Sequence, residues 1–67
     1  MKKIYYLNFC RKHQHRNGYV EIYASNIDSA LDVAVATFRT NFQQVREGRD
    51  FDASKFRDGC VMKLEGT

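Results

Sequence analysis

The chain has 67 residues, of which 43% are hydrophobic and 28% charged, and its net charge is +3. This length suffices for one domain with a thin core, so we treat residues 1–67 as a single domain. No apolar run approaches the roughly 20 residues of a membrane span, and the run after Met1-Lys2-Lys3 is too short for a signal peptide. We therefore expect a cytoplasmic protein with no membrane partner.

The charges are distributed unevenly along the chain. The first twenty residues carry five basic and no acidic side chains, whereas the remainder carries six basic and eight acidic ones. This gradient is the strongest electrostatic signal in the sequence. It indicates that the N-terminal segment is where a charged partner would bind.

Two strands are predicted near the N-terminus. Residues 3–11 are rich in aromatic and β-branched side chains, and residues 19–24 alternate between an apolar and a mixed face. The Asn-Gly dipeptide at 17–18 favours a turn, so the strands should form a hairpin. A two-residue turn there would bury His13 and His15 beside the core, because residues opposite one another share a sheet face. We therefore expect a longer, irregular tip.

An amphipathic helix is predicted next. Ser25-Asn26-Ile27-Asp28 fits a capping box, in which the Ser25 hydroxyl accepts a hydrogen bond from the Asp28 amide. Apolar residues then recur at the spacing of one helical face, and Gly48 is a plausible stop. The residues of that face, expected in the core, are Ile27, Ala30, Leu31, Ala34, Val35, Phe38 and Phe42, with Val45 as an extension.

The rest of the chain is predicted to be an irregular connection followed by a strand. Residues 49–58 carry Phe51 and Phe56 among charges, which suggests a short turn that tucks an aromatic ring under the helix. Gly59 then precedes a last strand over residues 60–65. A right-handed crossover places that strand beside the first one. The expected fold class is α+β, a β-β-α-β chain with a three-stranded antiparallel sheet of order 2-1-3 and the helix on one face.

No residue constellation indicates catalysis. His13 and His15 share one side of an extended segment, and Cys10 is near, but a zinc site needs three or four converging ligands. Cys10 with a histidine would also need an oxyanion site and a pocket to act as a nucleophile. We expect no enzymatic activity, no cofactor and no metal. Cys10 and Cys60 are expected to be free thiols in a reducing compartment.

The candidate binding surface combines charged and aromatic side chains. Three cations at the turn of the hairpin form what we call the basic tip, namely Arg11, Lys12 and Arg16. Three tyrosines are expected on the sheet face away from the helix, which we call the open face. Cations speed encounter with an acidic partner, and aromatic side chains anchor interfaces. The candidate partner-binding residues are Arg11, Lys12, Arg16, Tyr6, Tyr19 and Tyr23.

Two segments resemble a known family. Gly18–Ala34, a strand with a capped amphipathic helix, and the later strand Gly59–Glu65 resemble small phage-encoded α+β proteins and are similar to type I-F anti-CRISPR proteins. The resemblance implies a viral inhibitor that acts in the host cytoplasm by occupying a surface that a defence complex needs for DNA. It assigns a role to no individual residue.

Three functions fit this surface. The first is a protein-binding inhibitor that sterically occludes a nucleic-acid-binding host complex. The second is a nucleic-acid-binding accessory protein, in which the tip contacts phosphates and the tyrosines stack on bases. The modest net charge and the position of Glu21 between Tyr19 and Tyr23 count against it. The third is a structural subunit that self-associates as a homodimer through the open face.

Overall fold

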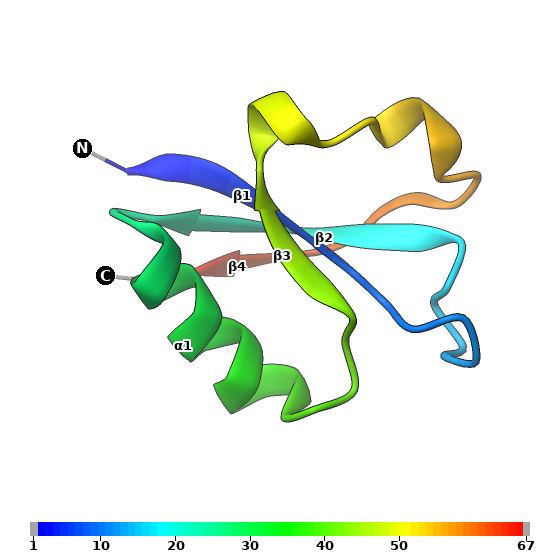
Figure 1. Ribbon diagram of the computed structural model, residues 1–67, viewed down its shortest axis with the longest axis horizontal. Coiled ribbons are helices and arrows are strands. Elements are labelled where there is room, and N and C mark those ends of the chain that lie inside the picture. Colours follow the sequence, from blue (N-terminus) through cyan, green and yellow to red (C-terminus); the bar gives the residue numbers. More distant parts are fainter. Residues whose placement is uncertain (1, 67) are drawn as a thin grey trace.

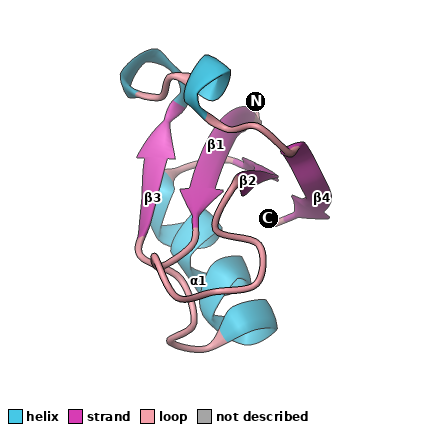
Figure 2. Cartoon of the chain, turned by 90° about the vertical axis from the view of Figure 1, so that its right-hand side faces the viewer, coloured by secondary structure: helices cyan, strands magenta, loops and turns pink. Residues whose placement is uncertain are grey.

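The computed structural model describes residues 2–66 as a mixed four-stranded sheet with one α-helix packed on one side (Figure 1). The strand order is β3-β1-β2-β4 (Figure 2). β1 is antiparallel to β2 and β3, whereas β4 runs parallel to β2. The α+β class is therefore confirmed. The strands are β1 (Lys3–Asn8), β2 (Gly18–Ala24), β3 (Gln44–Glu47) and β4 (Gly59–Glu65).

The predicted three-stranded antiparallel sheet of order 2-1-3 is wrong in two respects. β3, from a segment expected to extend the helix, occupies the place beside β1. The final strand therefore pairs with the other free side of the hairpin, beside β2 and parallel to it. Gly18 begins this pairing, where a Cβ atom would lie 2.5 Å from Val61 Cγ1 and 3.0 Å from the Gly59 carbonyl oxygen. The close approach of β2 and β4 thus requires glycine at position 18.

The predicted hairpin is confirmed, with its apolar sets on one face as expected, although its first strand ends at Asn8 and not at residue 11. Leu7 lies opposite Val20 and Tyr5 opposite Ile22, so the apolar sets of both strands share one face. β1 ends at Asn8 and β2 begins at Gly18, which leaves the long tip that the register argument requires. The core under the helix consists of Tyr5, Leu7, Phe9, Val20, Ile22, Ala24, Ala30 and Ala34.

The helix α1 (Ile27–Phe38) is shorter than predicted. It ends at Arg39, which has a φ of 57° and donates its backbone N–H to the Val35 carbonyl at 2.8 Å. The chain then turns into β3, where Val45 lies opposite Leu7. The helical spacing of apolar residues continues in the sequence past the end of the helix. The reason is that Phe42, in a loop, and Val45, in β3, also pack against the core.

The buried face of α1 is rotated from the predicted one. Ala30 and Ala34 are fully buried, whereas Leu31 and Val35, both expected in the core, are 37% and 53% exposed. The two alanines lack long side chains, so the backbone of α1 can lie close to the sheet. Ile27, Leu31 and Val35 therefore form an exposed row, which we call the helix stripe.

The N-terminal cap of α1 is Asn26 and not the predicted Ser25. The Asn26 Oδ1 atom accepts a hydrogen bond from the Ser29 backbone N–H at 2.9 Å. Replacing Asn26 with alanine should therefore lower the free energy of unfolding by about 0.5–2 kcal/mol, because an amide of the first turn loses its acceptor. Thermal melts followed by circular dichroism measure this loss. Ser25→Ala is the matched control and should melt near wild type; a larger loss at Ser25 would contradict the assigned cap.

Residues 48–58 cross to the sheet face opposite α1 (Figure 1). They contain two short 3-10 turns, η1 (Gly48–Asp50) and η2 (Ala53–Lys55). The expectation that an aromatic ring from this segment tucks under the helix is wrong, because Phe51 and Phe56 contact tyrosines of the open face instead. Among the described residues, no helix has the length and apolar character needed to cross a membrane.

Candidate functional site

The basic tip is an ordered series of turns. The His13 backbone N–H donates to the Cys10 carbonyl at 2.9 Å, and the Arg16 N–H donates to the His13 carbonyl at 3.1 Å. The Gly18 N–H closes the last turn on the His15 carbonyl at 2.9 Å. Backbone that is already ordered loses less conformational entropy when a partner binds.

The two histidines fix the tip to the core. The His13 ring stacks on Phe9 with ring centroids 4.3 Å apart, and its Nδ1 accepts from the His15 backbone N–H at 3.0 Å. Phe9 is only 4% exposed and meets Phe38 of α1 edge-on at 5.2 Å. Sequence reasoning missed this contact, because nothing in the His-Gln-His pattern shows that the chain turns back onto Phe9.

The three cations of the basic tip are exposed. Among the side chains described, those of residues 2–49 and 51–66, the ion pairs are Lys2 with Glu65 at 3.5 Å and Arg49 with Glu47 at 3.1 Å, and neither includes a tip residue. The charges of Arg11, Lys12 and Arg16 are therefore not neutralised by an ion pair within this part of the chain. A partner with an acidic surface can meet them directly.

Four aromatic rings pack together on the open face and form what we call the aromatic cluster. Tyr6 stacks on Phe51 at a centroid distance of 4.5 Å, and Phe51 stacks on Phe56 at 4.9 Å. Tyr19 contacts all three rings with its plane steeply inclined to theirs, at distances of 5.1–5.7 Å. Aromatic rings generally prefer such offset-stacked and edge-on arrangements. The cluster is a second, small apolar core on the sheet face opposite α1.

The open face is thus less open than predicted. Tyr6 and Tyr19 are half-buried within the aromatic cluster. Burial raises the pKa of Tyr19 above its ordinary value, and electrostatic repulsion from Cys60 and Glu21 adds to the effect. Two phenylalanines in an otherwise charged loop indicate that the loop packs on an apolar surface, but they do not indicate that this surface is the one that carries Tyr6 and Tyr19.

Tyr23 does not lie with the basic tip. It pairs with Ile4, near the end of the hairpin remote from the tip. The Tyr23 hydroxyl donates to the Glu21 carboxylate at 3.2 Å, and this hydrogen bond is the main cause that raises the pKa of Tyr23. The predicted site residues therefore separate into the tip cations, the clustered Tyr6 and Tyr19, and an isolated Tyr23.

A cavity of about 200 Å³ lies beside the aromatic cluster. Asn8 donates from its Nδ2 to the Gln43 Oε1 at 3.0 Å, while the buried Asn8 Oδ1 has no hydrogen-bond partner. Two cations also line the cavity, as does Asp52, whose pKa is lowered by hydrogen bonds from the Ser54 hydroxyl and amide. The complete lining is Asn8, Arg46, Phe51, Asp52, Lys55 and Phe56.

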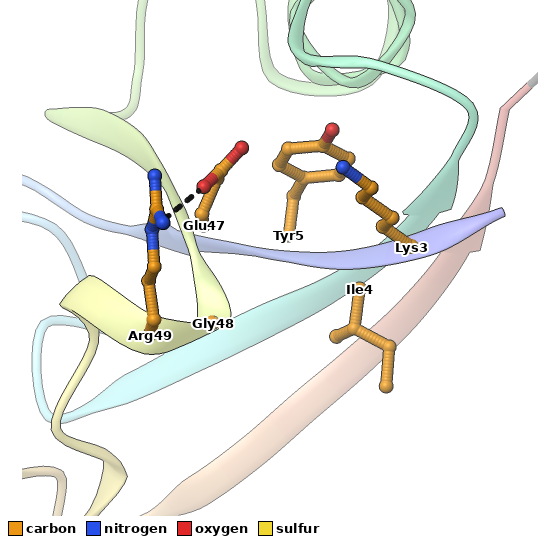
Figure 3. Close-up of a pocket in the computed structure, with 6 residues that line it drawn as sticks. All are labelled: Lys3, Ile4, Tyr5, Glu47, Gly48 and Arg49. Atoms are coloured by element: carbon orange, nitrogen blue, oxygen red, sulfur yellow. Dashed lines mark ion pairs between the residues drawn. The ribbon is translucent and has the colours of Figure 1, made fainter.

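A second cavity, of about 370 Å³, opens between the start of β1 and the end of β3 (Figure 3). Lys3 and Tyr5 point to one side of β1 and Ile4 to the other, and the Glu47–Arg49 ion pair lies across from them. The basic side chains are thus accompanied by a carboxylate that is already paired.

Among the side chains of residues 2–49 and 51–66, no group of three or more His, Cys, Asp or Glu converges on a metal-binding point. Cys10 and Cys60 are both free thiols. Comparisons of the chain with protein families, with curated proteins and with solved structures find no match.

Proposed function

We propose that this chain is a small non-enzymatic binding protein that inhibits a nucleic-acid-binding host complex by steric occlusion, as type I-F anti-CRISPR proteins do. In this proposal the chain is phage-encoded and acts in the cytoplasm of the host cell. The observation that carries it is the basic tip, a preordered loop whose three cations are exposed and take part in no ion pair described within residues 2–66.

The tip suits an acidic protein surface for two physical reasons. Its backbone is held by turn hydrogen bonds and by the stack of His13 on Phe9, so binding orders little additional chain. Its cations accelerate encounter with a surface of opposite sign. Tyr19 lies at the start of β2 next to the tip and supplies aromatic surface there, whereas Tyr23 pairs with Ile4 near the other end of the hairpin.

Reversing the tip charges should abolish inhibition while leaving the fold intact. The Arg11→Glu, Lys12→Glu, Arg16→Glu variant should lose more than about tenfold in affinity, because each exposed cation becomes a repulsive anion. The chain is immobilised, incubated with bacterial lysate, and the captured complex is released. Binding of a labelled oligonucleotide to that complex is then measured with and without added chain, and wild type should displace the oligonucleotide.

The matched control carries the same change in charge outside the tip, as Lys3→Glu, Arg57→Glu and Lys63→Glu at three exposed positions. It should inhibit like wild type. Circular dichroism establishes that both triple variants are folded. Inhibition by the tip variant equal to that by wild type would contradict the proposal.

Nucleic-acid binding is the second candidate, and the cavity beside the aromatic cluster favours it. Arg46 and Lys55 line this cavity together with the unpartnered Asn8 Oδ1, which could accept an N–H of a base. Against it, both faces of the Phe51 ring are covered, by Tyr6 and by Phe56, so a base cannot stack there. Direct binding of a single-stranded oligonucleotide, weakened steeply by salt and by Lys55→Glu, would favour this candidate.

A further inference from the structure

We propose that the free edge of β3 and the helix stripe together form a self-complementary interface, through which two copies of this chain pair. This interface differs from the open face, since it lies at the sheet edge on the side that carries α1. In the dimer, the β3 strands of both copies pair antiparallel. The two four-stranded sheets then join into one continuous sheet with both helices on the same face.

The first observation is that α1 has more apolar surface than the sheet of one chain covers. Ile27, Leu31 and Val35 recur every four residues and are 38%, 37% and 53% exposed. Val33, on the opposite flank of the helix, faces the end of β4, since a Cβ at Gly66 would lie 2.9 Å from Val33 Cγ2. The three stripe residues therefore lie on the flank that is directed away from β4. A contiguous apolar row on an otherwise polar surface is typical of a protein contact site.

The second observation is that the helix stripe adjoins an unpaired strand edge. β3 is the outer strand next to β1 and leaves one side of its backbone without a neighbouring strand. An open groove of about 570 Å³ runs along this edge, lined by Ile27 of the stripe together with Gln44, Val45, Arg46, Glu47 and Arg49. Apolar side chains and free backbone groups thus share one surface.

The side chains of β3 favour pairing with β3 of a second copy, and they favour one register of that pairing. In a continuous sheet, directly opposed residues point to the same face. A residue of β3 can therefore lie opposite the same residue of the second copy, but not opposite its neighbour in sequence, which points to the other face. The two-fold axis must thus pass midway between the two copies of one β3 residue. An axis at Arg46 would place two guanidinium groups opposite each other, and an axis at Glu47 would do so with two carboxylates, both of which are unfavourable. An axis at Gln44 would place Val45 opposite Gln43 and Arg46 opposite Phe42 of the second copy, so that each apolar side chain meets a polar one. An axis at Val45 places an apolar pair at the centre and Gln44 opposite Arg46 of the second copy.

The Val45 register also reuses an existing hydrogen bond. Within one chain, Arg46 Nη2 donates to Gln44 Oε1 at 2.9 Å. In the dimer the same donor and acceptor face each other across the axis, so they can exchange partners without leaving a polar group unsatisfied. A two-fold axis perpendicular to the sheet at Val45 also runs the two helices antiparallel, with their stripes facing.

The oligomeric state tests this interface. Mass measured by light scattering at increasing concentration should rise from 7.9 kDa toward twice that value. Leu31→Lys with Val35→Lys should keep the chain monomeric, because two lysines would face two others across the axis. Ala36→Lys with Thr40→Lys adds the same charge at exposed positions off the stripe and should dimerise like wild type. A wild-type mass that stays monomeric up to the solubility limit would overturn the proposal, as would equal dimerisation of both variants.

Disulfide trapping tests the register independently of the stripe variants. Cys10→Ser and Cys60→Ser remove the native thiols, and Gln44→Cys and Arg46→Cys are then made separately in that background. When the two proteins are mixed and oxidised, the Val45 register predicts a mixed disulfide-linked dimer, identified by its mass, in large excess over either homodimer. A dominant Arg46→Cys homodimer, or no cross-linked species, would contradict the register.

Discussion

Replacing Phe9 with alanine should lower the free energy of unfolding by about 3–5 kcal/mol, because a buried aromatic side chain loses both its transfer free energy and its packing contacts. The ring is 4% exposed, and it contacts both His13 of the tip and Phe38 of α1. A domain of this size has a total stability of only about 3–10 kcal/mol. Much of the variant should therefore be unfolded at room temperature.

Urea denaturation followed by circular dichroism measures this loss. Phe38→Ala is the informative control, because helical periodicity alone points to Phe38 as the central aromatic residue, yet its side chain is only half-buried. Its loss should be clearly smaller than that of Phe9→Ala. The reverse order would show that the helix, and not the end of β1, holds the tip to the core.

A loss of about 2 kcal/mol in the free energy of unfolding is expected from Phe51→Ala. Phe51 is the middle ring of the aromatic cluster and contacts Tyr6, Tyr19 and Phe56. Each aromatic pair contributes about 0.5–1.5 kcal/mol beyond its buried area. Because Phe51 is half-exposed, the free energy gained by removing its side chain from water is smaller than for a fully buried ring. The variant should release residues 48–58 from the sheet while the core under α1 stays formed.

Hydrogen exchange measured by mass spectrometry separates this local release from global unfolding. Amides of residues 48–58 should exchange faster in Phe51→Ala, while those of α1 keep their protection. Lys55→Ala, an exposed residue of the same segment, is the matched control and should exchange as wild type does. Unchanged exchange in the Phe51 variant would mean that the segment is held by other contacts.

The hairpin could be predicted because its signals are local. Alternating side chains in two segments, together with the requirement that opposed residues share a face, place Leu7 opposite a member of the Val20, Ile22 and Ala24 set without knowledge of any other element. In the structure its partner is Val20. The same requirement predicted the long tip, because a tight turn would have buried His13 and His15. Local pattern and sheet geometry agree here, and the prediction is correct.

The remainder of the sheet could not be predicted, because apolar spacing does not reveal where a helix ends. Phe42 and Val45 continue the helical period of α1, but the positive φ of Arg39 ends the helix and the chain returns as β3. Once β3 pairs with β1, the crossover that would place the last strand there is blocked. One misplaced helix end therefore led to a wrong strand count and a wrong strand order.

The candidate site was predicted in part. The exposure of Arg11, Lys12 and Arg16 follows from their place in a loop between two strands. The cover over Tyr6 and Tyr19 could not be foreseen, since either sheet face could receive Phe51 and Phe56. That choice depends on space: α1 already fills one face, so the two rings pack on the other.

Lys2 and Glu65, which are close to the two ends of the sequence, lie together and far from the basic tip. Lys3 pairs with Ala24 and Tyr23 with Glu65, so β1 begins where β2 and β4 end, and Lys2 reaches Glu65 at 3.5 Å. The tip lies at the opposite end of the sheet (Figure 1). A fluorophore, an affinity tag or a fusion partner can therefore be attached at either terminus without obstructing the tip. The molecule can be tethered to a surface by one end and present Arg11, Lys12 and Arg16 outward.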